Sequence, residues 1–471
     1  MTDTTSAPAH AMPFTAPTGT RHPLPAPELG AAVRADDRAH VFHSWSAQSL
    51  IDPLPVAGGS GSTFWDYEGN AYLDFSSQLV NLNLGHGHPD LVEAIRHQAG
   101  RLATIQPSMA SDVRGELARR IAEVAPGDLD RVFFTNGGAD ANEYAVRMAR
   151  LVTGRRKVLS AYRSYHGATA TAISLTGDPR RWANEPGDGS VAHFFGPYPY
   201  RSAFHSSTPE EEADRALAHL EQVIVLEGAE TIAAIILETI VGTNGVLVPP
   251  PGYLAGVREL CDRYGIVYIA DEVMVGFGRV GEWFAVNGFG VVPDLVTFAK
   301  GVNSGYVPLG GVIMSPWIAA YFDERPFPGG LTYSGHPLAC AAGVATFEVF
   351  ERDRILEHVR DLGERIVAPR LAAVADAHPS VGEVRGRGLF WAIELVRDQG
   401  THEPLVPFNA SGADAAPVAA VAAACKRAGL WPFTHFNRVH VAPPLVIAEE
   451  ELAHGLDIID EALDVADAHL G

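Results

Sequence analysis

Short apolar runs that alternate with helical patterns most constrain the fold of this chain. The clearest run, residues 232–237 (IAAIIL), is apolar at every position, and a helical pattern at 253–264 follows it. Runs without polar alternation suit strands buried on both faces, and helices between such strands indicate a parallel sheet covered on both sides. The predicted strands are residues 131–134, 157–160, 232–237, 266–270 and 295–299.

The pattern changes after about residue 345 and predicts a smaller α+β domain. Its predicted elements are helices at 346–375, 416–428 and 448–468 and strands at 388–395 and 438–442. A chain of 471 residues exceeds one ordinary domain, so we expect two or three. Residues 1–35 are rich in Ala, Pro and Thr, which predicts a flexible arm.

Composition and charge exclude several classes of protein. Hydrophobic residues make up 47% of the chain and charged residues 19%, so a large core can form. The net charge of -21 is spread along the sequence. It argues against a nucleic-acid partner, because phosphate backbones require clustered Lys and Arg. We expect no membrane span, since no run of 18 apolar residues occurs, and no signal peptide.

The cysteines indicate the compartment. Cys261, Cys340 and Cys425 are far apart and form no CxxC pair. We expect reduced thiols in a cytoplasmic protein, with neither a disulfide framework nor a metal site.

The residues after each predicted strand are candidates for a binding site, because open α/β sheets bind ligands beyond the carboxyl ends of their strands. Asn136, Gly137, Gly138 and Ala139 follow the first strand and precede a helix. Small residues at a helix N-terminus can bind a phosphate through backbone N–H groups. The alternative is a tight turn with an N-cap.

Three side chains extend this set. Asp271 follows residues 266–270 and suits a protonated ring nitrogen, with a helix cap or buried salt bridge as the alternative. Lys300 follows residues 295–299, where partial desolvation favours a Schiff base over an ordinary solvent-exposed lysine. Tyr165 provides either a ring-stacking face or a core aromatic. Together these residues predict the cofactor pyridoxal 5'-phosphate (PLP), because it needs a phosphate site, a stacking face, a partner for its ring nitrogen and an amine that captures its aldehyde.

Five segments, in this order, resemble the class III aminotransferases of PLP fold type I. They are FFTNGGADANEYAVRMAR, SYHGAT, LETIVGTNGVLVPPPGYLAGVRELCDRYGIVYIADEVMVGFGRVGEWFA, PDLVTFAKGVNSGYVPLGG and LTYSGHPLACAAG, and the likeness runs from about Phe64 to Leu445. The resemblance implies an α/β fold with a large domain, whose mostly parallel sheet is flanked by helices, and a smaller α+β C-terminal domain. The expected divisions are an arm at 1–35, a segment joining the small domain at 36–78, the PLP-binding domain at 79–345 and the small domain at 346–471.

The resemblance also implies roles for single residues. Lys300 would capture the cofactor's aldehyde and then move a proton as general base and acid, while Asp271 would pair with the ring nitrogen. Thr332 would reach the phosphate of a neighbouring subunit, which implies a homodimer or a larger tetramer. The other cofactor-binding residues implied are Gly138 and Ala139 at the phosphate, Tyr165 and Val273 on the ring faces, and Glu238 near the O3' side. Arg279 is expected to be structural.

The substrate pocket departs from the family pattern. Val80 stands where a Trp is common, and Phe433 stands where an arginine often binds the substrate carboxylate. Arg438 or His435 could supply the missing charge; the alternative is that Arg438 pairs with an acidic neighbour in the core. The run TYSGHP resembles the branch that acts on taurine or other ω-amino acids with pyruvate.

These observations predict a transaminase. It would move an amino group from an amine or ω-amino acid, such as taurine or β-alanine, to a keto acid such as pyruvate by a ping-pong Schiff-base mechanism. The main alternative is an aminomutase of the glutamate-1-semialdehyde type, which shares the cofactor residues. A non-enzymatic binder is a further alternative. A nucleotide-binding protein is disfavoured, because neither GxxxxGK[ST] nor GxGxxG follows the first strand.

Overall fold

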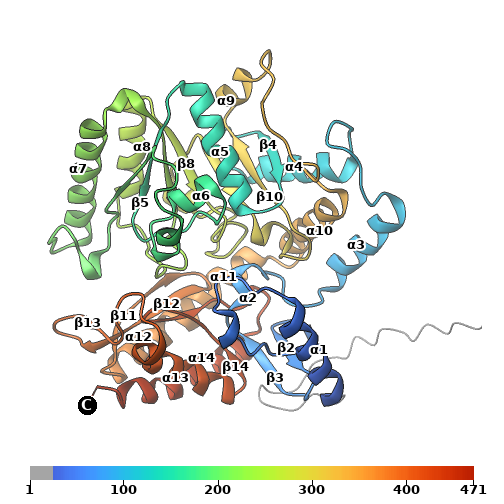
Figure 1. Ribbon diagram of the computed structural model, residues 1–471, viewed down its shortest axis with the longest axis vertical. Coiled ribbons are helices and arrows are strands. Elements are labelled where there is room, and N and C mark those ends of the chain that lie inside the picture. The colour runs from blue at the N-terminus through green and yellow to red at the C-terminus, as the bar shows by residue number, and fades with distance from the viewer. Residues whose placement is uncertain (1–24, 471) are drawn as a thin grey trace, which may run out of the picture.

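The computed structural model describes residues 25–470. Figure 1 shows an upper body and a lower body, and the lower body brings the blue N-terminal elements beside the red C-terminal ones. Within residues 25–470, no helix is long and apolar enough to cross a membrane.

Seven strands form the central sheet of the upper body. They are β4 (Arg131–Thr135), β5 (Lys157–Ala161), β6 (Val191–Phe194), β7 (Ile232–Glu238), β8 (Val267–Asp271), β9 (Leu295–Phe298) and β10 (Gly310–Met314). Their order is β4-β10-β9-β8-β7-β5-β6. The five strands from β9 to β6 are parallel, and β10 is antiparallel to both of its neighbours. The predicted mostly parallel sheet is therefore confirmed.

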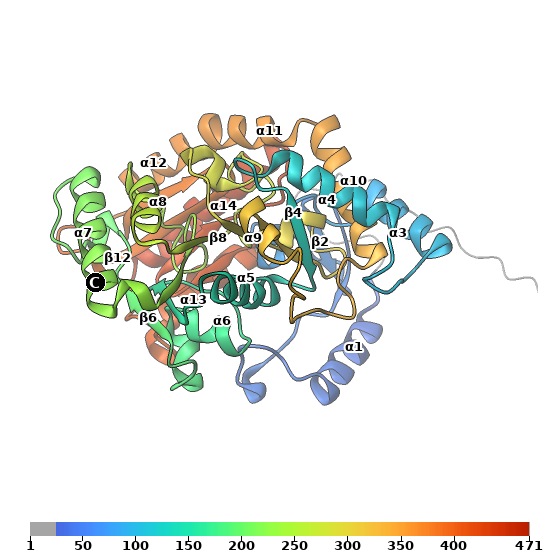
Figure 2. The same cartoon turned by 90° about the horizontal axis from the view of Figure 1, so that it is seen from above.

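Helices cover both faces of this sheet, which explains why its strands are apolar at nearly every position. They are α4 (Asp112–Val124), α5 (Gly138–Thr153), α6 (Ala170–Leu175), α7 (Pro209–Glu227), α8 (Tyr253–Tyr264), α9 (Pro316–Tyr321) and α10 (Pro337–Arg352), and α3 (Pro89–Arg101) packs on α10. In β7, Ile235 and Leu237 pack in one core with α4, α8 and α10, and Ala234 and Ile236 pack in another with α5. Figure 2 shows α4 and α10 on one side of β4 and β8, with α5 and α6 on the other.

The lower body combines segments from both ends of the described chain. Its strands are β1 (Val56–Ser60), β2 (Thr63–Asp66), β3 (Ala71–Asp74), β11 (Val381–Arg387), β12 (Phe390–Asp398), β13 (Glu403–Pro404), β14 (Leu430–Trp431), β15 (Phe433–His435) and β16 (Arg438–Val441). Its helices are α1 (Pro27–His40), α2 (Ser77–Val80), α11 (Ile355–Leu362), α12 (Ala368–Ala377), α13 (Ala416–Arg427) and α14 (Glu449–Asp467). β3 pairs in parallel with β14, and Leu73 lies opposite Leu430.

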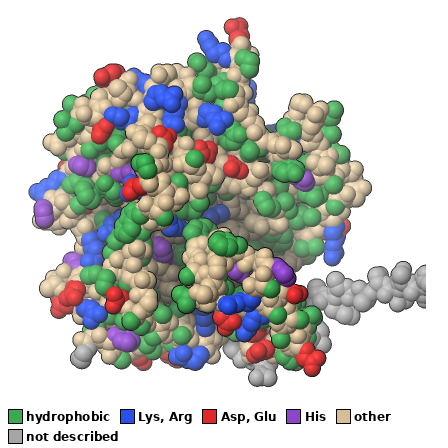
Figure 3. All heavy atoms as spheres, viewed as in Figure 1, with side chains coloured by type: hydrophobic (Ala, Val, Ile, Leu, Met, Phe, Trp, Pro, Cys, Tyr) green, Lys and Arg blue, Asp and Glu red, His purple; other side chains and the backbone are tan. Residues whose placement is uncertain are grey.

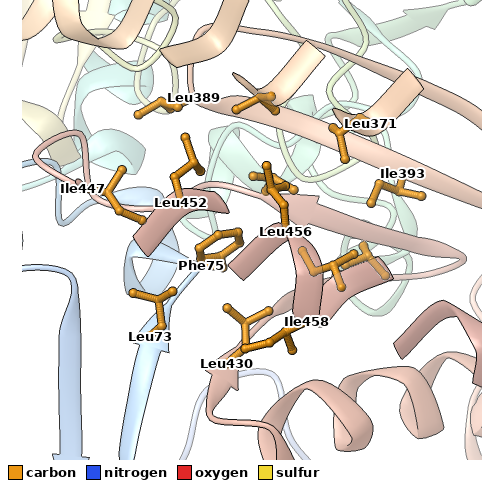
Figure 4. Packing of buried hydrophobic residues seen from close by; sticks show 14 of the residues in the cluster. Leu73, Phe75, Leu371, Leu389, Ile393, Leu430, Ile447, Leu452, Leu456 and Ile458 are labelled. Carbon is orange, nitrogen blue, oxygen red and sulfur yellow. The ribbon is translucent and has the colours of Figure 1, made fainter. Parts of the chain in front are cut away.

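One apolar core holds these distant segments together. Phe75, which follows β3, packs with Leu452 and Leu456 of α14 (Figure 4). The contact requires a glycine on the helix, because a Cβ at Gly455 would lie 2.1 Å from the Phe75 ring. Burying side chains of this size contributes about 1.5–3 kcal/mol each, so the N-terminal segment is firmly anchored to the C-terminal one.

The structure differs from the sequence predictions in several elements, and three of these differences follow. Helix α1 begins at Pro27, inside the range predicted as a flexible arm, and residues 1–24 of that arm lie outside the described residues. The single helix predicted at 346–375 is three helices, because Arg354 has a left-handed φ of 53° and a π-helical turn, Gly363–Val367, separates α11 from α12. β10 and β11 were not predicted, since glycines weaken the strand pattern in both.

Candidate active site

A cavity of about 370 Å³ lies at the carboxyl edge of the central sheet. Nine residues singled out from the sequence border it: Asn136, Gly137, Gly138, Ala139, Tyr165, Glu238, Asp271, Val273 and Lys300. Three of them end neighbouring strands. Glu238 of β7 lies opposite Asp271 of β8, and Lys300 comes two residues after the end of β9. The topology of the parallel sheet thus brings together residues far apart in sequence.

Asp271 is buried and held by three hydrogen bonds. Its Oδ2 accepts from Asn142 Nδ2 at 2.8 Å and lies 2.7 Å from His166 Nδ1, while its Oδ1 accepts from the backbone N–H of Val273 at 3.0 Å. Thr297 Oγ1 donates to Asn142 Oδ1 at 2.7 Å and so orients the amide. The carboxylate therefore has a fixed direction at the cavity wall.

Lys300 opens a short 3-10 helix, Lys300–Asn303, with a left-handed φ of 45°. Such a conformation costs about 1–3 kcal/mol in a residue with a side chain, and it is concentrated at functional sites. Burial lowers the pKa of Lys300 to about 8, although Glu238 and Asp271 oppose the shift. Among residues 25–470, the Nζ atom has no hydrogen-bond partner. The amine is therefore available for chemistry near neutral pH.

Glu238 borders the same cavity as Lys300 and is held by two backbone N–H groups. Its Oε1 accepts from the N–H of Tyr165 and its Oε2 from the N–H of Gly242, each at 2.8 Å. Burial raises the pKa of Glu238 to about 7. This carboxyl group can therefore gain or lose a proton at the pH where the lysine does.

Tyr165 is covered on one side by an ion pair that the sequence did not indicate. The Cζ atom of Arg180 lies 3.7 Å from the centroid of the Tyr165 ring. Arg180 pairs with the buried Asp178 and donates through Nη2 to Thr243 Oγ1 at 3.0 Å. The guanidinium therefore covers one face of a ring that also borders the cavity.

The N-terminus of α5 meets the cavity with little room for side chains. Helix α5 begins at Gly138, and a Cβ there would lie 2.6 Å from Val273 Cγ1. A Cβ at Gly167 would lie 2.5 Å from that of Ala139. Backbone N–H groups at the start of a helix of this length favour an anion.

We expect Gly138→Ala to weaken PLP binding about 10-fold, since overpacking of this kind costs about 1–3 kcal/mol. The added methyl group would displace Val273, which borders the same cavity. Titration of the apo-enzyme with PLP, followed by absorbance, measures the Kd. Gly115→Ala, at an exposed helix position where a Cβ meets nothing within 4 Å, is the control and should leave the Kd unchanged. An unaltered Kd for Gly138→Ala would contradict the prediction that the N-terminus of α5 binds the cofactor's phosphate.

These residues fit PLP. One cavity is bordered by four features that bind this cofactor: a free amine, an oriented carboxylate, an aromatic ring and a helix N-terminus. Asn142 and His166 were missed as parts of the site. His166 lies within the run SYHGAT. Asn142 is a polar residue on the buried face of α5, and a polar residue at an apolar position of a helical pattern is the sequence signal that could have identified it.

Four other predicted residues do not border this cavity. Thr332 is exposed on a loop. Val80 is buried in an apolar cluster, and Met274, which does border the cavity, packs against that cluster. Arg438 is buried, and its Nε atom lies 3.5 Å from the carboxylate of Glu394. This is the ion pair with an acidic core neighbour that the sequence offered as the alternative role. His435 lies opposite Arg438 on the neighbouring strand. The buried Arg279 donates to the carbonyls of Pro443 and Leu389, contacts typical of a structural residue.

Comparisons with known proteins identify the family of this chain. The family model for class III aminotransferases matches residues 46–463. A probable aminotransferase of Mycobacterium tuberculosis is 38% identical over 91% of this chain and 93% of its own length. The taurine–pyruvate aminotransferase of Rhodobacter capsulatus is 33% identical over 94% and 99%. A crystal structure of taurine:2-oxoglutarate aminotransferase from Bifidobacterium kashiwanohense, in complex with PLP and glutamate, is 42% identical over 94% and 99%, with a TM-score of 0.90. These findings favour transamination over the aminomutase alternative.

Proposed function

Because this chain belongs to the class III aminotransferases of PLP fold type I, we propose that it takes amino groups from ω-amino compounds such as taurine or β-alanine and transfers them to keto acids such as pyruvate. The observation that carries the proposal is that Lys300 and Asp271 border one cavity, at the ends of neighbouring strands. The named activities of the taurine–pyruvate and taurine:2-oxoglutarate relatives support the substrate class.

The residues of the cavity have different roles in the proposed reaction. Bound PLP supplies an aldehyde that reacts with amines and a pyridine ring that withdraws electrons from the carbon bearing the amine. Asp271, oriented by Asn142 and His166, keeps the ring nitrogen protonated. Lys300 Nζ takes the proton from the substrate carbon and returns it, because its lowered pKa of about 8 lets it act as base and then as acid. The cofactor is held by the other lining residues, namely Gly138, Ala139, Tyr165, Val273 and Glu238.

The residues predicted for the substrate stay proposals. Val80 belongs to the apolar cluster against which Met274 of the cavity lining packs, so a larger side chain at position 80 would alter the support of Met274. Burial, together with the nearby Arg180 and Arg438, lowers the pKa of His435 to about 4. His435 would therefore be neutral at pH 7, and Arg438 would supply the positive charge on this side.

A homodimer would complete the site. Leu79, Met109 and Tyr333 are at least half exposed in the single chain, with exposed fractions of 56%, 50% and 60%. A partner subunit that covered these side chains would remove their apolar surface from water. The partner subunit's Thr332 would then reach the phosphate. Three buried free cysteines support a cytoplasmic setting.

The test of this function follows the purified, PLP-loaded enzyme with and without an acceptor. With taurine, β-alanine or putrescine alone, we expect bleaching of the cofactor's absorbance and about one equivalent of product per site, because no acceptor restores the cofactor. Adding pyruvate should give continuous formation of alanine. Continuous turnover without any keto acid would instead indicate an aminomutase. No spectral response to any of these amines would remove ω-amino compounds as donors.

A further inference from the structure

Several arginines surround one buried carboxylate beside the catalytic cavity. Glu394 of β12 accepts hydrogen bonds from Tyr198 and Arg201, and from Arg385 Nη2 at 2.7 Å. Arg438 Nε lies 3.5 Å from the same carboxylate. Burial alone would raise the pKa of Glu394, but Arg385 and Arg438 hold it well below its ordinary value. Glu394 is therefore a fixed negative charge.

Arg163 is a further member of this cluster, and it is not neutralised. In the part of the chain that the structure describes, its guanidinium makes no hydrogen bond and no ion pair. Its Cζ lies 5.3 Å from the ring centroid of Tyr198 and 5.7 Å from that of Phe408. Burial lowers the pKa of Arg163, and the neighbouring Arg438 and Arg201 lower it too. Tyr198 and Glu394 oppose this shift, but among the described residues no carboxylate pairs directly with the Arg163 guanidinium.

The cluster as a whole carries excess positive charge. It contains four guanidinium groups and two carboxylates: Arg163, Arg201, Arg385, Arg438, Glu383 and Glu394. Within residues 25–470, Arg201 Nη2 and Arg438 Nη1 are buried without a hydrogen-bond partner. Partly buried charges are costly unless an opposite charge compensates them. The cluster therefore favours an anionic ligand.

This anion site adjoins the catalytic cavity. A second cavity of about 140 Å³ is bordered by Arg163, Tyr198 and Arg201, and Glu238 borders both cavities. Arg163 is two residues before Tyr165 in the same loop, a separation of at most about 7 Å between Cα atoms. Figure 3 shows the surface hollowed between the two bodies, with basic and histidine side chains along the hollow. Glu238 is thus the lining residue shared by the cavity that holds Lys300 and the cavity that holds Arg163 and Arg201.

The geometry points to a substrate class for the acceptor, and this inference rests on the proposed function: Arg163, with Arg201 and Arg438 beside it, binds the distal carboxylate of a dicarboxylic keto acid. Pyruvate is too short to use this contact and is accepted without it. The enzyme therefore prefers a five-carbon dicarboxylic acceptor such as 2-oxoglutarate over a five-carbon monocarboxylic one such as 2-oxovalerate.

The experiment compares these two acids and pyruvate as acceptors for the PLP-loaded enzyme with a saturating amine donor. We expect kcat/KM for 2-oxoglutarate to exceed that for 2-oxovalerate by about 10- to 100-fold, the value of one or two hydrogen bonds to a charged group. Arg163→Gln should remove most of this difference and change kcat/KM for pyruvate by less than about 3-fold. Arg397→Gln, which removes an exposed arginine of β12, is the matched control and should retain the difference.

Binding without turnover gives a second readout. Calorimetric titration of the enzyme whose cofactor the amine donor has already aminated, the form that meets the acceptor, should show glutarate binding about 10-fold more tightly than valerate, with the advantage lost in Arg163→Gln. Glutarate should also inhibit pyruvate turnover competitively. Equal kcat/KM for the two five-carbon acids, or non-competitive inhibition by glutarate, overturns the inference. A failure of pyruvate and both longer acids as acceptors overturns the proposed transamination itself.

Discussion

Lys300→Ala is expected to lower kcat by about 10⁴-fold, the upper range for the loss of a positioned acid–base group. The variant loses the amine that captures the cofactor's aldehyde and the group that moves the proton. The chain contains only two other lysines, Lys157 and Lys426. Lys157 pairs with Glu227, and Lys426 lies 4.0 Å from the centroid of the Trp431 ring, so each is engaged elsewhere.

Three measurements check this prediction. Steady-state turnover gives the loss in kcat, and absorbance gives the loss of the covalent link to PLP. Borohydride reduction followed by peptide mass analysis should place one cofactor on the peptide containing residue 300 in the wild type. Lys300→Arg keeps a positive charge but cannot capture an aldehyde, so it should be as inactive as the alanine variant. Lys426→Ala should remain active. Normal turnover by Lys300→Ala would remove this lysine from the mechanism.

The sequence predicted those parts of the fold whose local pattern agrees with the final packing. Residues 232–237 could be recognised as a strand because both faces are buried, and residues 253–264 as a helix because their apolar stripe fits α8. Lys300 and Asp271 could be located because they end such strands. β10 could not be recognised, since its two leading glycines have no side chains to show a pattern.

The rest of the site depends on contacts between distant elements. Asn142 acquires its role only when α5 packs beside the ends of β8 and β9, where it meets Asp271 and Thr297. Arg180 lies in a short 3-10 helix, Pro179–Asn184, whose position follows from its pairing with Asp178 and not from periodicity. For Arg438, the sequence allowed both a substrate role and a core ion pair, and only the pairing of β12 with β16 brought Glu394 opposite it.

Asp271→Asn is expected to lower kcat by about 10²- to 10³-fold, comparable to the loss of one preorganised charge-stabilising contact. The substitution keeps the size of the side chain and removes its negative charge, so the ring nitrogen is no longer held in its protonated form. It also disturbs the bonds with Asn142 and His166, because an amide nitrogen cannot accept from the donors that now meet Oδ2.

Single-turnover kinetics with a saturating amine separate this effect from weaker cofactor binding. The rate of the bleaching step should fall by the full factor, whereas the Kd for PLP should change by less than about 10-fold, because the Lys300 link and the α5 N-terminus remain. Asn142→Ala should lower the same rate by a smaller factor, since it leaves the carboxylate in place and removes one of its three bonds. Asp262→Asn, an exposed carboxylate on α8, should have no effect. If Asp271→Asn bleached at the wild-type rate, the ring nitrogen would not depend on this carboxylate, and the role assigned to it would be wrong.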